Sequence, residues 1–333
     1  MSAPISGTVG LSGGPLMVEV RGLTVAFPAQ GGAIRPVRGV TFGVAGARTL
    51  GIVGESGSGK SMTLRAVLGM VPRPGLIESG SVLLGGQELV GAPPALLQSI
   101  RGSQIGMIFQ DPMASLNPVL SVGDQLSEVI RVKLGLGHRA AADRAAELFD
   151  RVGIKPARDR LRAYPHEFSG GMAQRVMIAI AIALKPKVLL ADEPTTALDV
   201  SVQDQVLELL EFLRDEDGMS MIIVSHDIGV IARMCDDVAV MYGGQILELG
   251  SVDEVLRQPR HPYTRMLLAT VPSLDARSGR RLASIPGQLP DLATVAAGCP
   301  YVGRCPSARD ACSSLVVALD APMGRHASAC PFV

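Results

Sequence analysis

The chain has 333 residues, of which 47% are hydrophobic, and its 31 basic and 31 acidic side chains cancel to a formal charge of zero. This length predicts about two domains with a sizeable core, and the neutral balance argues against a strongly basic nucleic-acid binder or an acidic disordered tail. The longest wholly apolar run, Val176–Leu184, has nine residues, whereas a helix needs about 20 to span a bilayer. We therefore expect no membrane span. Residues 1–15 lack the features of a secretory signal and are interpreted as a flexible leader of a cytosolic protein.

Short alternating patterns begin the chain after this leader. Between Leu16 and Gly46 they predict antiparallel strands, with a break at the Gly/Pro-rich stretch Pro28–Gly32. Thr49–Val53 is a compact apolar strand followed by a glycine-rich turn and a helical pattern, which is the order of a parallel α/β unit. Polar residues with helical periodicity then indicate an inserted helical lobe, assigned to about residues 105–175.

Parallel-sheet character returns in the apolar segments Lys187–Glu193 and Met221–Asp227. The helix predicted between them places its apolar residues on one face: Val206, Leu209, Leu210 and Leu213. A hairpin is expected across Gly243 and Gly244. After about residue 257 the chain becomes rich in proline, arginine and cysteine. One domain is therefore expected over residues 16–256 and a small irregular domain over residues 257–333.

A phosphate-binding motif stands between the first apolar strand and the first predicted helix. Gly54–Ser61 reads GESGSGKS, which fits Gly, any four residues, Gly-Lys-Ser/Thr, although a glycine-rich turn can end in Lys-Ser by chance. Glycines let backbone N–H groups turn inward around a phosphate, and the helix dipole favours its charge. Lys60 is expected to reach the β and γ oxygens of a nucleotide, and Ser61 to coordinate Mg²⁺. The predicted nucleotide-binding residues of this segment are Gly54, Glu55, Ser56, Gly57, Ser58, Gly59, Lys60, Ser61 and Met62.

Two adjacent carboxylates, Asp192 and Glu193, follow the apolar residues Val188–Ala191. Paired carboxylates are ordinarily a solvated strand end, but a phosphate loop in the same chain favours a catalytic interpretation. Asp192 is then placed to hold the Mg²⁺ shell, and Glu193 to polarise a water for in-line attack on the γ-phosphate.

The segment Phe168–Arg175, FSGGMAQR, resembles the signature motif of ATP-binding cassette (ABC) ATPases. Other residues resemble motifs of the same family, in the family's order: Phe27 the aromatic that stacks on adenine, Gln110 the Q-loop glutamine, Asp199 the D-loop aspartate and His226 the switch histidine. The resemblance implies an α/β fold. The implied fold is an ABC-type P-loop nucleotide-binding domain with a RecA-like core, an antiparallel β subdomain and a helical subdomain, followed by a small irregular Cys-rich C-terminal domain.

The resemblance also implies roles for these residues. Glu193, His226 and Gln110 are the implied catalytic residues, and Gln110 and His226 are also implied to bind ATP. Ser61, Gln110 and Asp192 are the implied Mg²⁺ ligands. The implied contacts to a partner's ATP are Ser169, Gly170, Gly171, Met172 and Asp199. The signature departs from its commonest form, Leu-Ser-Gly-Gly-Gln, at Phe168 and Met172, but the Ser-Gly-Gly turn still supplies a hydroxyl and backbone N–H groups for a phosphate. In this family, ATP lies between the phosphate loop of one chain and the signature motif of another. The resemblance therefore implies a second ATPase, either a copy of this chain or a paralogue.

Several longer segments closely resemble the ATPases of bacterial oligopeptide, dipeptide and nickel importers, among them MIFQDPMASLNP, ADEPTTALDV and the tail segment RHPYTRMLL. The resemblance implies two permease subunits contacted through Asp111–Pro118, an extracytoplasmic peptide-binding protein, and a peripheral place at the cytoplasmic face of the plasma membrane. The alternatives are an importer of nickel or another small solute, and a soluble non-transport ABC ATPase. The neutral charge and the lack of a long coiled-coil insertion or a second cassette count against the last, and no nucleic-acid partner is expected.

Four of the five cysteines lie in the last 35 residues, spaced C-x5-C-x6-C-x17-C: Cys299, Cys305, Cys312 and Cys330. In a reducing compartment such a group favours a metal or cluster site over disulfides. Four thiolates complete a [4Fe–4S] cluster or a tetrahedral Zn²⁺ site. The open spacing and the resemblance favour the iron–sulfur cluster, with zinc and unliganded thiols as alternatives. Cys235, which follows an apolar helix, is expected to be a packed thiol.

Overall fold

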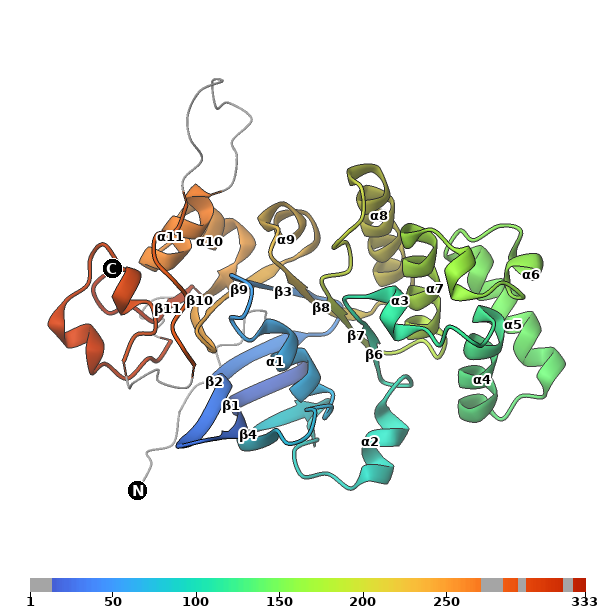
Figure 1. The fold of residues 1–333 in the computed structure, drawn as a ribbon, viewed down its shortest axis with the longest axis horizontal. Coiled ribbons are helices and arrows are strands. Elements are labelled where there is room, and N and C mark those ends of the chain that lie inside the picture. The colour runs from blue at the N-terminus through green and yellow to red at the C-terminus, as the bar shows by residue number, and fades with distance from the viewer. Residues whose placement is uncertain (1–13, 271–283, 293–297, 320–325) are drawn as a thin grey trace. The chain divides into compact units, whose positions relative to one another are not determined.

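The computed structural model describes residues 14–270, 284–292, 298–319 and 326–333, so that nearly all of the proposed leader lies outside the described residues. The chain divides into two compact units. The first unit contains residues 1–92 and 224–333, and the second contains residues 93–223. The labels in Figure 1 follow the chain through both units.

An antiparallel sheet in the first unit has the strand order β2-β1-β4-β5. Its strands are β1 (Leu16–Ala29), β2 (Gly32–Ala45), β4 (Leu76–Leu84) and β5 (Gln87–Glu88). Val18, Val20, Leu23 and Val25 of β1 are buried while several residues between them are partly exposed. This alternation means that one face of the sheet forms core. The antiparallel pairing of β1 with β2 confirms the predicted strands.

Four further strands of the first unit run in the order β11-β10-β9-β3. They are β3 (Thr49–Val53), β9 (Asp237–Tyr242), β10 (Gln245–Ser251) and β11 (Ala327–Ser328). β3 is parallel to β9, and β9 and β10 form the predicted hairpin. Gly243 and Gly244 at its turn have φ angles of 56° and 82°, a left-handed pair that favours glycine in a two-residue hairpin.

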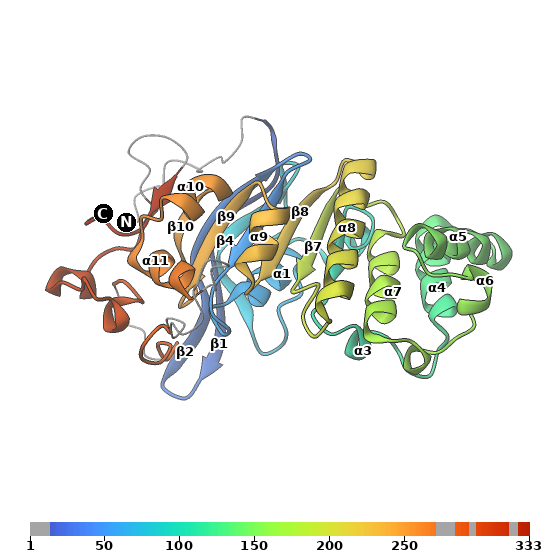
Figure 2. The same ribbon diagram turned by 90° about the horizontal axis from the view of Figure 1, so that it is seen from above.

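Helices and short 3-10 turns of the first unit pack around these strands. They are α1 (Lys60–Val67), α9 (Ile228–Met234), α10 (Val252–Arg257), α11 (Pro262–Ala269), η2 (Val302–Arg304) and η3 (Asp310–Ser313). α9 contacts β3, and α10 contacts β9 and β10. In Figure 2, α10 and α11 lie along the β9–β10 hairpin. The tail belongs to the same compact unit as the phosphate loop.

The second unit holds three strands in the order β8-β7-β6, of which β6 and β7 are parallel. They are β6 (Ile105–Ile108), β7 (Val188–Asp192) and β8 (Ser220–Ser225), and every residue of all three is buried. The boundary between the two units falls within β8, whose last residues, Val224 and Ser225, belong to the first unit. The predicted helical lobe, residues 105–175, therefore begins with a strand, because four apolar residues bounded by polar ones suit a buried strand better than a helix.

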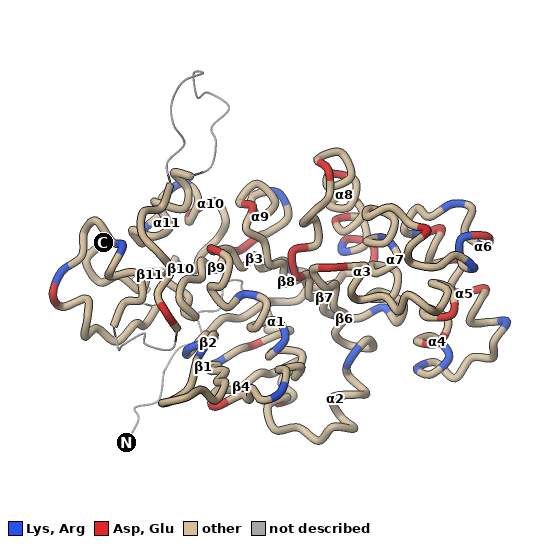
Figure 3. Tube along the Cα trace, viewed as in Figure 1, with Lys and Arg blue, Asp and Glu red and all other residues tan. Residues whose placement is uncertain are grey.

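The helices of the second unit are α2 (Pro94–Ile100), α3 (Pro112–Ser115), α4 (Val122–Leu134), α5 (His138–Arg151), α6 (Ala157–Arg160), η1 (Pro165–Glu167), α7 (Gly170–Ile182) and α8 (Val200–Asp217). α7 contacts α3, α4, α5 and α8. Basic and acidic residues are interspersed along these helices (Figure 3). Among the described residues, no helix combines the length and the apolar character needed to cross a bilayer.

A buried carboxyl group joins strand β10 to two tail segments of the first unit. Glu248 is fully buried. It accepts hydrogen bonds from the backbone N–H groups of Arg260 at 2.7 Å and His261 at 2.9 Å, and from Nε2 of His326 at 2.6 Å. Three donors satisfied by one side chain make this group a central link between hairpin and tail.

Replacing this carboxyl group is expected to destabilise the first unit strongly. Glu248→Ala leaves three donors without an acceptor, two of them buried, and should lower the free energy of unfolding by about 3–5 kcal/mol. Glu248→Gln keeps one acceptor oxygen and should lower the free energy of unfolding by less than half as much as Glu248→Ala. Urea unfolding followed by far-UV circular dichroism measures both. Glu208→Ala, which removes an exposed carboxylate from α8, is the control, and equal midpoints for the two alanine variants would contradict the prediction.

Candidate nucleotide-binding site

The phosphate-loop segment forms the predicted strand, turn and helix in the first unit. It leaves the fully buried β3 and enters α1, whose N-cap, Gly59, is left-handed with φ 104°. A Cβ atom on Gly59 would lie 2.1 Å from the Pro36 carbonyl oxygen, and one on Gly54 2.0 Å from that of Met241. Glycine is therefore required at both positions by close backbone approach. The turn delivers the N-terminus of an eight-residue helix, a favourable place for a phosphate.

The ammonium group of Lys60 lies across this turn. Its Nζ donates hydrogen bonds to the carbonyl oxygens of Gly54 at 2.8 Å and Glu55 at 2.9 Å, and the residue is buried. The lysine is thus positioned within the loop by the loop's own backbone. A phosphate that entered the loop would compete with these two carbonyl groups for the ammonium.

Two other predicted site residues also belong to the first unit. His226 is exposed and follows β8, and the next residue, Asp227, caps α9 by accepting the Gly229 N–H at 2.7 Å. Phe27 lies in β1, partly exposed, with its ring so close to Gly75 that a Cβ there would meet it at 2.5 Å. The stacking of Phe27 on adenine stays a prediction.

The acidic pair and the Q-loop glutamine meet in the second unit. Asp192 is the buried last residue of β7. Glu193 follows it with φ 48°, a left-handed conformation that is uncommon outside glycine. Its Oε2 accepts hydrogen bonds from Nε2 of Gln110 at 3.1 Å and from Oγ1 of Thr196 at 2.8 Å. The structure therefore brings Gln110 and Glu193 together, and it adds Thr196, a residue that the motif analysis missed.

The signature turn lies beside the D-loop aspartate in the same unit. Ser169 caps α7 by accepting the Met172 N–H, and Asp199 caps α8 by accepting the Val202 N–H at 3.0 Å. A Cβ on Gly171 would lie 2.4 Å from Val202, so a side chain there would separate α7 from α8, which lie side by side in Figures 1 and 2. Ser169 and Gly170 are exposed at this helix N-terminus.

The unusual residue of the signature motif has a structural role. Phe168 precedes the exposed Ser169 and is 8% exposed. Its buried ring thus anchors the turn to the apolar core of this unit.

Two tail residues contact the phosphate loop and were not predicted. The Tyr263 hydroxyl accepts a hydrogen bond from the Glu55 N–H at 3.0 Å, and the Arg304 guanidinium donates to both carboxylate oxygens of Glu55 at 3.0 Å. These residues are 208 and 249 positions apart from Glu55 in the chain, and no spacing pattern signals so distant a contact.

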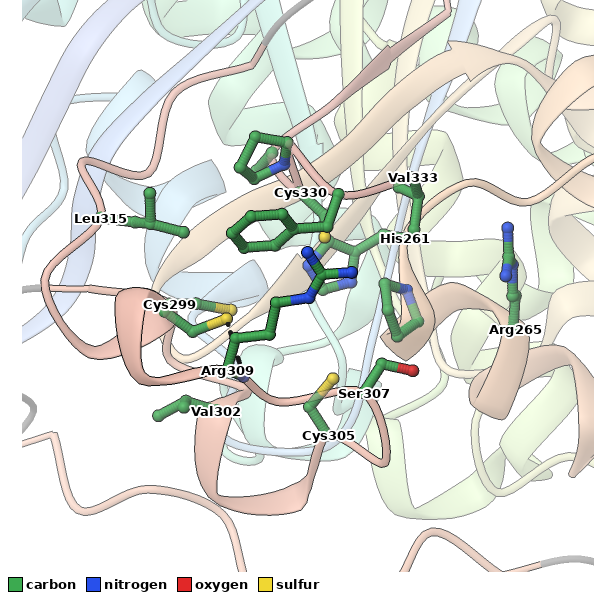
Figure 4. A pocket seen from close by; sticks show the side chains of 15 residues that line it. His261, Arg265, Cys299, Val302, Cys305, Ser307, Arg309, Leu315, Cys330 and Val333 are labelled. Carbon is green, nitrogen blue, oxygen red and sulfur yellow. Dashed lines mark hydrogen bonds between the residues drawn. The ribbon is translucent and has the colours of Figure 1, made fainter.

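The four tail cysteines line one cavity of about 230 Å³, together with His261, Arg309 and Phe332 (Figure 4). All four are free thiols, and burial raises the pKa of Cys299 to about 11. Within the described ranges, however, no group of three or more His, Cys, Asp or Glu side chains is arranged to hold a metal ion. The structure therefore does not support the predicted iron–sulfur or zinc ligand set. Cys235 is partly buried against the apolar core of the first unit, as expected for a packed thiol.

Comparisons with known proteins agree with the motifs. Residues 37–196 match the family described as "ABC transporter", and residues 247–312 match "Oligopeptide/dipeptide transporter, C-terminal region". The chain is 49% identical to the oligopeptide transport ATP-binding protein OppD of Bacillus subtilis, over 83% of this chain and 77% of that protein. It is 46% identical to OppD of Salmonella typhimurium, over 90% and 89%.

Among solved structures, the chain is similar to the ATP-binding cassette MJ0796 in a dimeric post-hydrolysis state bound to ADP and phosphate. The TM-score is 0.65 and the identity 26%, over 71% of this chain and 99% of that one. The predicted α/β cassette fold and ATPase activity are confirmed by these likenesses. The chain belongs to the ABC transporter ATPases and carries a C-terminal region of the oligopeptide/dipeptide transporter type.

Proposed function

We propose that this chain is the ATP-hydrolysing subunit of a membrane importer of di- and oligopeptides. The observation that carries the proposal is the tail match, which covers residues 247–312 and adds a peptide-transporter region to an ABC cassette. The OppD relatives are themselves named oligopeptide transport ATP-binding proteins. In this proposal the chain is a peripheral subunit at the cytoplasmic face of the plasma membrane. It contacts two permease subunits, and through them an extracytoplasmic peptide-binding protein.

The proposed chemistry is hydrolysis of ATP held between the phosphate loop of one ATPase and the signature motif of a second. Lys60 and the loop N–H groups contact the β and γ phosphates, and His226 orients the attacking water. Glu193 takes a proton from this water as its oxygen bonds to the γ-phosphorus, and the bond to the bridging oxygen of ADP breaks. Asp192, Ser61 and Gln110 would hold Mg²⁺ through oxygen atoms, the ligands that this ion prefers, and bound Mg²⁺ neutralises phosphate charge.

Closing of the two ATPases on ATP and their reopening after hydrolysis would drive the permeases between two orientations. The second ATPase is a copy of this chain or a paralogue. Exposed apolar side chains such as Met113 and Val119, which lie in and next to the predicted permease-contacting segment Asp111–Pro118, support a protein partner there.

Growth on peptides tests the transported solute. A strain that lacks the gene should fail to grow when peptides are the sole source of a required amino acid, and should grow normally on the free amino acid. Restoring the gene should restore growth, whereas a Lys60→Ala copy should not. Unimpaired growth on peptides together with lost nickel uptake would favour the nickel-importer alternative. If the chain purified from membranes brought no permease subunits with it, a soluble, non-transport ATPase would be favoured.

We further propose that Cys299, Cys305, Cys312 and Cys330 bind a [4Fe–4S] cluster. The support is chemical: four soft thiolates suit such a cluster, and these four line one cavity. Because the described residues contain no preformed ligand group, the thiols would have to draw together around the cluster. The site would be structural or sensory, since ATP hydrolysis transfers no electrons.

Anaerobic purification followed by metal and sulfide analysis tests the cluster. About four iron and four sulfide ions per chain are expected. Cys305→Ala should lose most of them, whereas Cys235→Ala, at the packed thiol outside the cavity, should retain them. Zinc without sulfide would show that the four thiols bind zinc and not a cluster. The absence of iron, sulfide and zinc would show that the thiols are unliganded.

A further inference from the structure

Three of the chain's four tyrosines form one buried cluster at the junction between cassette and tail. Tyr242 ends β9, Tyr263 lies in α11 and Tyr301 precedes η2. Their ring centroids are 4.6 to 5.3 Å apart, and all three side chains are fully buried. Aromatic contacts of this kind add to the free energy of area burial. The two tail segments are therefore anchored firmly against the hairpin next to the phosphate loop.

The position of Tyr263 is set by the first turn of α11. His261 caps this helix: its Nδ1 accepts the Tyr263 N–H at 3.0 Å, and Pro262 occupies the first helical position. Burial, with a smaller contribution from Arg265, lowers the pKa of His261 to about 4, so the ring is neutral at pH 7 and its Nδ1 accepts. The capped turn and the aromatic cluster together aim the Tyr263 hydroxyl at the Glu55 N–H.

Arg304 reaches the same loop residue from the other tail segment. Besides its two hydrogen bonds to the Glu55 carboxylate, Nη1 donates to the Tyr242 hydroxyl at 3.1 Å. Nε donates to the Pro286 carbonyl oxygen at 2.7 Å and Nη2 to that of Ile285 at 3.0 Å. The Arg304 side chain is only 7% exposed. A buried guanidinium with this many defined partners is held in one orientation.

Glu55 is thus held at three different groups. Tyr263 accepts its N–H, Arg304 binds its carboxylate and Lys60 donates to its carbonyl oxygen. If Lys60 turns toward bound phosphates, the loop loses the hydrogen bonds that this lysine makes to the Gly54 and Glu55 carbonyl groups. The two contacts from the tail do not depend on Lys60 and would still hold the start of the loop. Ordering a loop in advance removes part of the entropic cost of binding.

We propose that Tyr263 and Arg304 of the tail are positioning residues for ATP binding, which act by holding Glu55 and thereby the backbone of the phosphate loop. The proposal rests on the proposed ATP site. It assigns to the tail of this chain a direct effect on nucleotide affinity.

A pair of tyrosine variants tests the first contact. Tyr263→Phe removes only the hydroxyl that holds the Glu55 N–H, and Tyr301→Phe removes a hydroxyl of the same cluster that has no hydrogen-bond partner among the described residues. In the purified full chain, Tyr263→Phe should raise the Kd for a fluorescent ATP analogue about fivefold, and Tyr301→Phe should leave it unchanged. Equal affinities of both variants and the wild type would overturn the proposal.

A double-mutant cycle tests the second contact. Glu55→Gln and Arg304→Met should each weaken ATP binding, and the double variant should be little worse than either, because both remove the same interaction. Arg304→Lys keeps the positive charge but not the planar guanidinium, so it should bind ATP more tightly than Arg304→Met and less tightly than the wild type. Strictly additive effects would contradict a shared path through Glu55.

Two further measurements separate positioning from general stability. Amide hydrogen exchange of residues 54–61 in the nucleotide-free protein should be faster in Tyr263→Phe than in Tyr301→Phe. ATP hydrolysis at saturating ATP should change much less than the KM for ATP. A lower melting temperature with unchanged Kd and exchange would mean a structural role only. If the wild-type chain bound no nucleotide, the proposed ATP site itself would be wrong. If the wild type and all variants bound nucleotide equally well, the ATP site would stand and only the positioning role would be wrong.

Discussion

Glu193→Gln is expected to lower steady-state ATP hydrolysis by about 100- to 10,000-fold, because a positioned general base contributes about this much to rate. ATP affinity should be retained. The amide is neutral and cannot take the proton of the attacking water. Its size matches the carboxylate, however, and its carbonyl oxygen can still accept the hydrogen bonds that Gln110 and Thr196 donate to Oε2. The local geometry of the second unit should therefore survive the change.

The measurement is phosphate release together with nucleotide binding, both on the chain combined with its partner ATPase. A closed, ATP-bound dimer should accumulate in the Glu193→Gln variant and be visible by size-exclusion chromatography. Glu128→Gln makes the same chemical change at an exposed position of α4 and should hydrolyse ATP normally. Undiminished turnover in Glu193→Gln would show that another group is the base.

Ser169→Arg is expected to abolish hydrolysis of the ATP bound to the partner while leaving ATP binding to this chain's own phosphate loop intact. Ser169 is exposed at the N-terminus of α7, where its hydroxyl caps the helix. An arginine side chain there would fill the space proposed for the partner's γ-phosphate and would hold the two ATPases apart. The lost cap should cost only about 1 kcal/mol of stability, which is too little to unfold the second unit.

A second serine cap provides the control. Ser121 caps α4 of the same unit by accepting the Asp124 N–H at 3.0 Å. Ser121→Arg therefore removes an equivalent cap away from the signature motif and should retain hydrolysis. If Ser169→Arg lost both hydrolysis and ATP binding, the composite arrangement of the site would be wrong, because binding to the chain's own loop does not require its own signature.

Local patterns were enough to predict most of the elements that carry the site. Apolar alternation predicted the long β1–β2 pair, and the glycine pair at residues 243 and 244 predicted the hairpin because only that turn chemistry suits a two-residue connection. The phosphate loop could be predicted equally well, since a Cβ atom on Gly54 or Gly59 would lie only 2.0 or 2.1 Å from a backbone carbonyl oxygen. In each case the signal and its structural cause lie within a few residues of one another.

Contacts between distant segments could not be predicted in the same way. The buried Glu248 stands in a strand that otherwise looks apolar, and its three donors come from two separate tail segments. Arg304 is one of many arginines in the chain, and nothing around it indicates a carboxylate partner 249 residues away. The open spacing of the four cysteines favoured a cluster site, and the four side chains line one cavity, but the described residues form no metal-binding group.

The tyrosine cluster gives this protein an unusual optical property. The chain contains no tryptophan and four tyrosines, and the only tyrosine outside the cluster, Tyr164, is 42% exposed in the second unit. Three of the four tyrosines that can emit in the ultraviolet therefore lie at the junction beside the phosphate loop. Intrinsic fluorescence, without any attached dye, should report whether the tail is seated against the cassette.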